Sequence, residues 1–399
     1  MDRRENIKRL LAEYMELEQS AENKRRRAMW DYLPKGGRDQ FRPVPKFDYS
    51  WKDGCIPITA DIQNPTWSEM FGFSLEDYYT NAEVFLESHL KIMLYRFKNF
   101  ADDTFLTKWI PIWGSCALEG SVFGMEYGFY HDKDPWLSHK PVIETSDDIK
   151  RFRDNPPDFK TVGIVPNFIK MYEECKEMLP DDYEVLFPHW CRSIFGVATY
   201  VRGYEDFLCD MLVDPDFAND LLRLITDVRR DYVEAMEKYT GEPRSLAFLY
   251  NDEINCPSIS PQNYRDMVFP YEKEICDFHG GAHYWHSCGD VTMLVPEIAK
   301  LPNLKLFNRG AWTDVYEAGV AFKDKCPLEI CMNPQKHILE GTKESMTALL
   351  NGMIEDCRRS DINGFYFKIS ALNRQSTTEH AVGQIKLWVE TAKEVISKV

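Results

Sequence analysis

A histidine and a cysteine two residues apart are the residues of this sequence best suited to hold a metal ion. His286 and Cys288 lie in the segment AHYWHSCGD, which begins at Ala282. On an extended strand, positions i and i+2 project to the same side, so an imidazole nitrogen and a thiolate sulfur could share one ion. Zinc accepts both ligand types, at ~2.0–2.3 Å. Gly289 would allow a turn after the pair, and Asp290 could orient one of the ligands.

Cys331 is the candidate for a third ligand. It ends the apolar run Pro327–Cys331, so its thiol is also expected at the end of a strand. His286, Cys288 and Cys331 together would leave a fourth position open, which is typical of catalytic zinc. Such an ion would bind a substrate heteroatom and act as a Lewis acid. The alternative is that these side chains are ordinary core residues.

Polar residues follow other apolar runs. Asp252 and Glu253 come directly after Leu246–Tyr250, and one of them should face the same site as a further metal ligand or a general acid. A helix cap or a salt bridge is the alternative. His189 follows Glu184–Pro188 and is a candidate acid/base or substrate contact.

Asn308 and Arg309 follow another run, Leu304–Phe307, and are candidates for binding a cofactor or substrate. The Arg309 guanidinium could hold a carboxylate or a phosphate. It could equally pair with Glu329 or Asp290 inside the protein.

The elements that must position these residues are short apolar runs that alternate with helical patterns. Each run has the length of a buried strand. Seven runs are visible: Trp109–Trp113, Glu184–Pro188, Leu246–Tyr250, Ala282–His286, Leu304–Phe307, Leu328–Cys331 and Phe365–Ile369. An eighth strand is expected in the N-terminal third, around Ile56–Ile58 or Ala28–Tyr32. Repeated strand–helix units predict a parallel sheet, and eight units predict a (β/α)₈ barrel of the α/β class, whose catalytic groups lie at the carboxyl ends of the strands.

Two regions are expected along the chain. Residues 1–104 form a helical, aromatic-rich N-terminal extension and cap that could include the first barrel strand, and residues 105–399 form the barrel. Trp51, Trp67 and Phe71 of the extension would suit an aromatic or methylammonium substrate, with ordinary packing as the alternative. An open doubly wound sheet is the structural alternative, but the chain lacks the Gly-rich phosphate loop that usually follows its first strand.

Composition narrows the functional classes. The 399 residues carry 48 Lys and Arg against 64 Asp and Glu, a formal net charge of −16. This charge disfavours binding to nucleic acid or to an anionic membrane over a broad surface. Eleven cysteines are too dilute for a disulfide scaffold, and the N-terminus lacks the apolar stretch of a secretory signal. A cytoplasmic protein with reduced thiols is expected.

Several motifs together resemble the uroporphyrinogen decarboxylase superfamily. They are RGYEDFL at residues 202–208 with Asp214-Pro215, Asp252-Glu253 followed by SISPQNY at 258–264 and FPY at 269–271, HSCGD at 286–290, and CMNP at 331–334. HSCGD is similar to a motif of the methyltransferase branch. The resemblance covers roughly residues 105–399 and implies the same (β/α)₈ barrel.

The methyltransferase branch contains zinc-dependent enzymes of corrinoid systems, including methylcobamide:coenzyme M methyltransferases and aryl-methyl-ether O-demethylases of anaerobic one-carbon metabolism. The resemblance implies a cytoplasmic methyltransferase, most simply of the O-demethylase type. It would move a methyl group between a small O-, N- or S-methyl compound, or a thiol, and a cobamide. The chain has no D-x-H-x-x-G motif, so the cobamide is expected on a partner corrinoid protein. A homo-oligomer is among the expectations.

The resemblance is incomplete at the metal site. The coenzyme M enzymes take a further cysteine ligand from the last strand, but here residues 368–372 read KISAL. The third ligand must come from elsewhere, with Cys331 expected first and Glu253 second. Two alternatives to the methyltransferase stay open: a metal-free decarboxylase of a porphyrinogen or another acid, and a non-catalytic barrel that binds a cobamide or a corrinoid protein.

Overall fold

The computed structural model describes residues 2–31, 41–46, 51–373 and 377–399. Its strands are β1 (Trp30–Asp31), β2 (Val44–Pro45), β3 (Ile58–Ile62), β4 (Trp109–Pro111), β5 (Tyr127–Gly128), β6 (Trp136–Leu137), β7 (Glu184–Leu186), β8 (Ala247–Tyr250), β9 (Ala282–His286), β10 (Phe307–Gly310), β11 (Leu328–Cys331) and β12 (Phe365–Leu372). Its longer helices are α1 (Arg3–Glu18), α2 (Ala21–Arg27), α3 (Asn64–Phe71), α4 (Leu75–Thr80), α5 (Ala82–Asn99), α7 (Ser146–Asp154), α8 (Val165–Met178), α9 (Ile194–Arg202), α10 (Tyr204–Val213), α11 (Pro215–Thr240), α13 (Phe269–His279), α15 (Val315–Phe322), α16 (Lys343–Ser360) and α17 (Thr378–Ile396). Short helical segments are η1 (Trp51–Asp53), α6 (Leu118–Val122), α12 (Pro261–Asn263), η2 (Tyr264–Val268), η3 (Thr292–Leu294), α14 (Val295–Ile298) and η4 (Pro334–Leu339).

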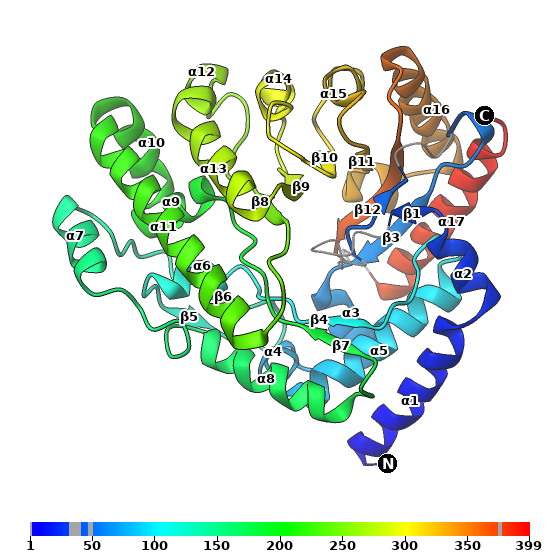
Figure 1. Cartoon of the computed structure of the whole chain (residues 1–399). Helices are drawn as coiled ribbons and strands as arrows, with labels where there is room; N and C mark the ends of the chain where they lie inside the picture. The colour runs from blue at the N-terminus through cyan, green and yellow to red at the C-terminus, as the bar shows by residue number, and fades with distance from the viewer. Residues whose placement is uncertain (1, 32–40, 47–50, 374–376) are drawn as a thin grey trace.

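Parallel strands form the centre of the molecule, and the helices surround them (Figure 1). The largest sheet has six strands in the order β3-β12-β11-β10-β9-β8, and β4 pairs with β7 in a second parallel sheet. A parallel bridge between Arg192 and Tyr250 joins the chain after β7 to β8. The strands therefore follow one another in chain order, and the predicted α/β fold with a barrel-like parallel sheet is confirmed.

Two aspartates link β3 to the segment that leads into β4. Among the described residues these two strands share no strand pairing. Instead, the Asp102 carboxylate accepts a hydrogen bond from the backbone N–H of Ala60 at 2.7 Å, and Asp103 accepts one from Ile58 at 3.0 Å. The Asp103 N–H also donates to the Ile58 carbonyl at 2.8 Å. Side chains thus satisfy backbone groups of β3 that would otherwise lack partners.

The seven apolar runs of the sequence all contribute strands, with one shift. β10 begins at Phe307, where the expected run ends, and only an isolated bridge at Leu304 remains of the earlier part. The register between β10 and β11 shifts between Asn308 and Gly310, whose φ of 69° suits glycine. β10 therefore carries Asn308 and Arg309 within the strand rather than after it.

The first barrel strand lies inside the N-terminal 104 residues. β3 pairs with β12 in parallel, close to the expected position Ile56–Ile58. In the other expected range, residues 28–32, β1 forms a short antiparallel ribbon with β2, while Tyr32 itself lies outside the described residues. The N-terminal part therefore supplies both a piece of the barrel and helices that cover it.

Side chains alternate between two apolar clusters along the strands. Leu249, Trp285 and Phe367 belong to the main core, which lies between the sheet and the helices. Their neighbours on the strands form a second cluster inside the ring of strands, together with the β1–β2 ribbon. The members of this inner cluster are Met29, Trp30, Val44, Phe105, Phe248, Tyr250, Tyr284, Leu306 and Tyr366. The inside of the barrel is therefore a packed interior rather than a pore.

Asp214 and Gly241 mark the two ends of α11. The Asp214 side chain caps α11 by accepting from the N–H of Phe217 at 3.2 Å, and Gly241 ends the helix with a φ of 74°. The aromatic residues expected to wall a pocket pack elsewhere. Trp67 is buried and stacks on Phe71 and Phe100, and the Trp51 indole donates to a backbone carbonyl at 2.9 Å.

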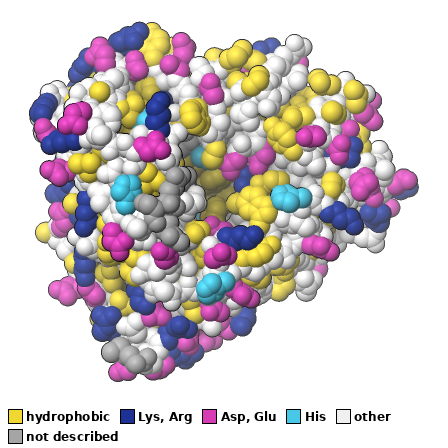
Figure 2. Space-filling view, turned by 180° about the vertical axis from the view of Figure 1, so that it is seen from behind, with side chains coloured by type: hydrophobic (Ala, Val, Ile, Leu, Met, Phe, Trp, Pro, Cys, Tyr) yellow, Lys and Arg dark blue, Asp and Glu magenta, His cyan; other side chains and the backbone are white. Residues whose placement is uncertain are grey.

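Within the described part of the chain, none of the helices has both the length and the apolar character that crossing a lipid bilayer requires. Figure 2 shows the face turned away from the viewer of Figure 1, which is hollowed near its middle. Hydrophobic side chains lie in this hollow, and acidic side chains lie at its edge.

Candidate metal centre at the carboxyl ends of β8 and β9

β9 ends at His286, and the turn that follows holds Cys288. The Ser287 hydroxyl fixes this turn by donating to the Ile254 carbonyl at 2.6 Å and accepting from the Gly289 N–H at 3.0 Å. A Cβ at Gly289 would lie 2.4 Å from the Asn255 Cβ, so only glycine fits there. The His286 Nε2 and the Cys288 Sγ lie 3.3 Å apart, as the spacing of the two residues predicts.

Asp252 completes a group of three possible metal ligands. It follows β8 by two residues, and its Oδ1 lies 2.9 Å from the His286 Nε2. One oxygen of Asp252, one nitrogen of His286 and the sulfur of Cys288 all lie within 4.8 Å of one another. No other group of three or more such side chains with this geometry occurs in the portions of the chain that the structure describes.

Asn308 fixes which nitrogen of His286 faces this group. The Asn308 amide donates from Nδ2 to the Glu329 Oε1 at 2.5 Å, so its Oδ1 is the atom 2.8 Å from the His286 Nδ1. An amide oxygen can only accept, so Nδ1 carries a hydrogen. In the neutral imidazole the lone pair is then on Nε2, which faces Asp252 and Cys288.

Cys331 lies outside this group. Its side chain is buried, and its Sγ contacts Asn308 Nδ2 at 3.2 Å and Ser370 Oγ at 3.7 Å. Burial, together with the charge of Glu329, raises the pKa of this thiol to about 12. Because the Asn308 amide stands between Cys331 and His286, the expected ligand set changes: Asp252 takes the place that the sequence had given to Cys331.

Arg192 holds both carboxylates that follow β8. Its Nη1 lies 2.7 Å from the Asp252 Oδ2 and 2.9 Å from the Glu253 Oε1, and its Nη2 donates to the Cys116 Sγ at 3.3 Å. Its guanidinium also lies over the Tyr200 ring, 5.1 Å from the ring centroid. Arg192 thus binds one oxygen of Asp252 and leaves the other directed at His286.

The charges of the group shift the pKa values of its members. Burial alone would raise the pKa of Asp252, but His286 and Arg192 outweigh it and hold that pKa well below its usual range. Burial would lower the pKa of His286, but the Asp252 carboxylate reverses this and raises it to about 10. Burial and the nearby Asp252 raise the pKa of Glu253 despite Arg192. The raised pKa of His286 favours its protonated form, which pairs with the ionised Asp252.

Sequence reasoning missed Arg192. The sequence predicts a strand that ends at Pro188, and His189 is the first polar side chain after that end. The chain instead returns to sheet pairing at Arg192, beside Tyr250 of β8. Burial alternates from Leu186 to Arg192, but the residue types do not, because Phe187 and Cys191 on the less buried side are also apolar, so the sequence carried no signal for this return to pairing.

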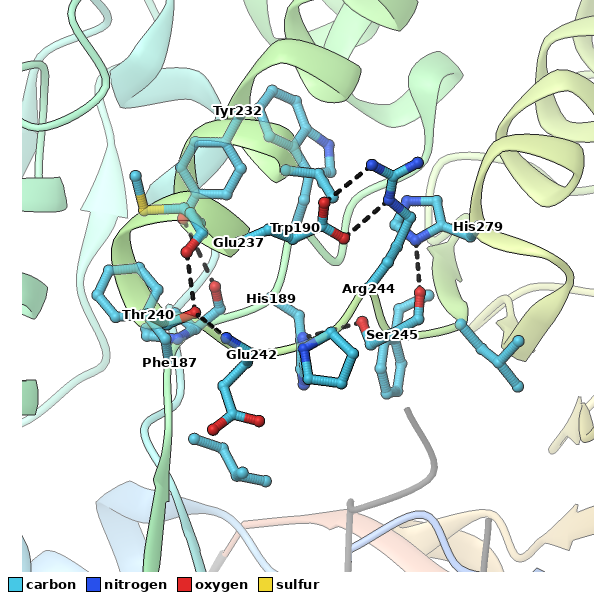
Figure 3. Close-up of a pocket in the computed structure, with 17 residues that line it drawn as sticks. Phe187, His189, Trp190, Tyr232, Glu237, Thr240, Glu242, Arg244, Ser245 and His279 are labelled. Atoms are coloured by element: carbon cyan, nitrogen blue, oxygen red, sulfur yellow. Dashed lines mark hydrogen bonds and ion pairs between the residues drawn. The ribbon is translucent and has the colours of Figure 1, made fainter. Parts of the chain in front are cut away.

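His189 lies in a different pocket (Figure 3). Its ring stacks on Phe248 with 5.2 Å between centroids, and its Nδ1 lies 3.4 Å from the Ser245 Oγ. Ser245 precedes β8, whereas Asp252 follows it, so the two residues stand at opposite ends of that strand. The pocket also contains the Arg244–Glu237 ion pair. A catalytic role for His189 is not supported by these neighbours.

Arg309 and Glu329 are structural neighbours of the site rather than parts of its surface. The Arg309 Nη1 donates to the carbonyls of Gly310 and Cys331 at 3.0 and 3.3 Å, and burial lowers the pKa of its guanidinium. Glu329 is fully buried and pairs with Lys368 Nζ at 2.9 Å. Binding of a cofactor by Asn308 or Arg309 therefore stays a prediction.

Comparisons with known proteins agree with this fold. The family model described as "Uroporphyrinogen decarboxylase (URO-D)" matches residues 72–395. No curated protein sequence matches the chain. Among solved structures, a "methyltransferase from Methanosarcina mazei" has a TM-score of 0.58 at 13% sequence identity, covering 85% of this chain and 94% of that one. At this identity the likeness concerns the fold alone.

Proposed function

Because the chain belongs to the uroporphyrinogen decarboxylase family, we propose that it is a zinc-dependent methyltransferase of that family's corrinoid branch. It moves a methyl group between a small O-, N- or S-methyl compound and the cobamide of a partner corrinoid protein. The observation that carries the proposal is the convergence of Asp252, His286 and Cys288. A structural neighbour of the chain is a methyltransferase, and this is compatible with the proposal.

The three side chains fit zinc. Carboxylate oxygen, imidazole nitrogen and thiolate sulfur are all zinc ligands, and three protein ligands leave one position for a substrate. The His286 tautomer set by Asn308 directs a lone pair at the same point. When bound, zinc would polarise the heteroatom that bears the methyl group and stabilise the charge that develops as the methyl leaves. Cys331, the first candidate for the third ligand, would lie behind Asn308 rather than in this set.

The other residues of the site have separate roles in this proposal. Arg192 holds Oδ2 of Asp252, so the carboxylate keeps one orientation and cannot rotate away from His286. Glu253 is the candidate general acid: its raised pKa lets the carboxyl keep a proton to higher pH than a free glutamate, and that proton could pass to the leaving heteroatom. Asn308 holds the hydrogen of His286 at Nδ1.

The experiment measures metal content and methyl transfer together. Purified protein should contain about one zinc per chain, and His286→Ala and Cys288→Ser should lose it. The absorbance of cob(I)alamin should change on methylation when the protein meets a panel of methyl ethers, methylamines and methyl thioethers. Cys209→Ser is the matched control, because Cys209 is an exposed cysteine on α10, outside the site. Equal zinc content in all of these proteins, or none in the native one, would contradict the proposal.

A metal-free decarboxylase is the second candidate, favoured by the description of the matching family model. It predicts carbon dioxide release from a porphyrinogen by protein that has been treated with a chelator. It gives no reason for a nitrogen, a sulfur and a carboxylate oxygen to converge at the ends of β8 and β9.

A further inference from the structure

Three aromatic rings form a cage directly beside the candidate metal centre. The cage consists of Trp113, Tyr250 and Tyr284. The His286 ring lies 5.4 Å from the Tyr250 ring and 5.8 Å from the Tyr284 ring, and it stacks nearly parallel to the latter. A substrate that reaches the metal centre therefore meets these rings.

The chain's own cation fills the cage. The guanidinium carbon of Arg42 lies 5.5 Å from the centroid of Trp113, 5.1 Å from Tyr250 and 5.7 Å from Tyr284. These are cation–π distances, and three rings around one cation is the arrangement by which proteins recognise methylated ammonium groups. A cage of this kind holds one cation at a time.

The backbone of the Arg42 segment is fixed inside the barrel. The His283 Nε2 contacts the Arg42 carbonyl at 3.0 Å, and the Lys368 Nζ donates to the carbonyl of Phe41 at 2.7 Å. Val44 packs in the inner cluster with Tyr250 and Tyr284 themselves. The barrel strands thus hold the backbone segment that places Arg42 beside the cage.

We propose that Arg42 is a specificity-determining residue that excludes cationic methyl donors, so that the substrate is a neutral or anionic methyl ether or thioether rather than a methylammonium compound. This inference rests on the proposed function. An ammonium group would have to displace the Arg42 guanidinium or stand beside it in the cage. At short distances inside a protein such repulsion is large. Specificity gained by repelling the wrong ligand is a common device.

The charges around the candidate metal centre differ from the net charge of the whole protein. With a net charge of −16, the protein as a whole attracts cations. Within the site, Asp252 and Glu253 are both paired with Arg192, and Asp252 also with His286. Neither carboxylate is therefore left to compensate a substrate cation.

The test compares tetramethylammonium binding to native protein, Arg42→Met and Arg42→Lys by isothermal titration calorimetry. Arg42→Met should empty the cage and bind tetramethylammonium roughly tenfold more tightly than native protein. Arg42→Lys keeps a cation in place and should behave like native protein. Adding Tyr250→Leu to Arg42→Met should remove the gain. Circular dichroism and thermal unfolding show whether each variant is folded.

One binding result would overturn the inference: a folded Arg42→Met that binds tetramethylammonium no more tightly than native protein does. In the methyl-transfer panel, activity of native protein on a methylammonium donor would also overturn it. Activity confined to ethers or thioethers would support it. If native protein transfers no methyl group at all, the proposed function fails, but the binding comparison still decides the role of Arg42.

Discussion

Two carboxylates inside the barrel have opposite surroundings. Glu329 is completely buried and accepts hydrogen bonds from Tyr284, Tyr366, Lys368 and Asn308, so every direction around it is occupied by a donor. Asp252 has Arg192 on one oxygen, while its other oxygen faces His286, beside the sulfur of Cys288.

The difference separates a structural ion pair from a binding site. Around Glu329, donors match acceptors, so nothing more is needed to stabilise the buried charge. Around Asp252, the side chains of Asp252, His286 and Cys288 all offer an electron pair when deprotonated, and they point at one another. A proton or a metal ion between them is therefore needed to offset their mutual repulsion. Asn308 connects the two regions, because its amide donates to Glu329 and accepts from His286.

Removal of Asp252 should have the largest effect. Asp252→Ala should lose bound zinc, and methyl transfer should fall by roughly a thousandfold or more, because Lewis-acid catalysis contributes several kcal/mol. Cys331→Ser should keep about one zinc per chain, since the Cys331 sulfur lies behind Asn308. Metal analysis and initial rates check both. The opposite pattern, with zinc lost only in Cys331→Ser, would restore the ligand set first expected from the sequence.

Removal of Glu329 should act first on stability, and it should reach the metal centre only through the orientation of Asn308. Glu329→Ala leaves Lys368 buried without its ion-pair partner, which costs roughly 3–5 kcal/mol of the free energy of unfolding. Glu355→Ala is the control, because the Glu355–Arg358 pair is exposed and should contribute about 0–1 kcal/mol. Urea unfolding measures both. Equal losses in the two variants would show that the network around Glu329 is not the buried structural pair inferred above.

Asn308 should have an intermediate effect on the metal. Asn308→Leu removes the acceptor that keeps the hydrogen of His286 on Nδ1, and zinc affinity should fall roughly 10–100-fold. Competition with a chromophoric chelator measures the affinity. Asn363→Ala, in an exposed turn, is the control. Unchanged zinc affinity in a folded Asn308→Leu would mean that the tautomer needs no support from this residue.

The last effect concerns the pH dependence of stability. Burial alone would raise the pKa of Glu329, but Lys368 and the two tyrosines outweigh it and lower the pKa to about 2, against 4.5 for an ordinary glutamate. A carboxyl with a lowered folded-state pKa stabilises the fold above its unfolded pKa, and this stability is lost as the pH falls from about 4.5 to about 2. Glu329→Gln should therefore flatten the acid limb of the unfolding free energy. An unchanged slope would assign acid unfolding to other groups.

Much of the fold could be predicted because it depends on local periodicity. Apolar runs of strand length depend only on residues near in sequence, and all seven contribute strands in the structure. The shift of β10 and the bridge that Arg192 forms with Tyr250 could not be predicted, because pairing with neighbouring strands decides them.

The candidate metal centre likewise contains residues that the sequence could predict and residues that it could not. The pairing of His286 with Cys288 follows from the i, i+2 geometry of a strand end, so the sequence was enough to find it. Whether Asp252 or Cys331 joins them depends on which side chain reaches across the barrel, and Asn308 stands in the way of Cys331. Arg42, 71 residues before Trp113 and 208 before Tyr250, gave no sequence signal at all.

The sequence by itself determined the alternation of strands and helices, the family motifs and the His-x-Cys pair, because each of these depends on residues close together in the chain. Only the tertiary structure decided the third member of the group, the arginine that holds it and the cation that fills the aromatic cage. These are contacts between separate strands and segments, and they exist only once the ring of strands brings distant side chains within a few ångströms of one another.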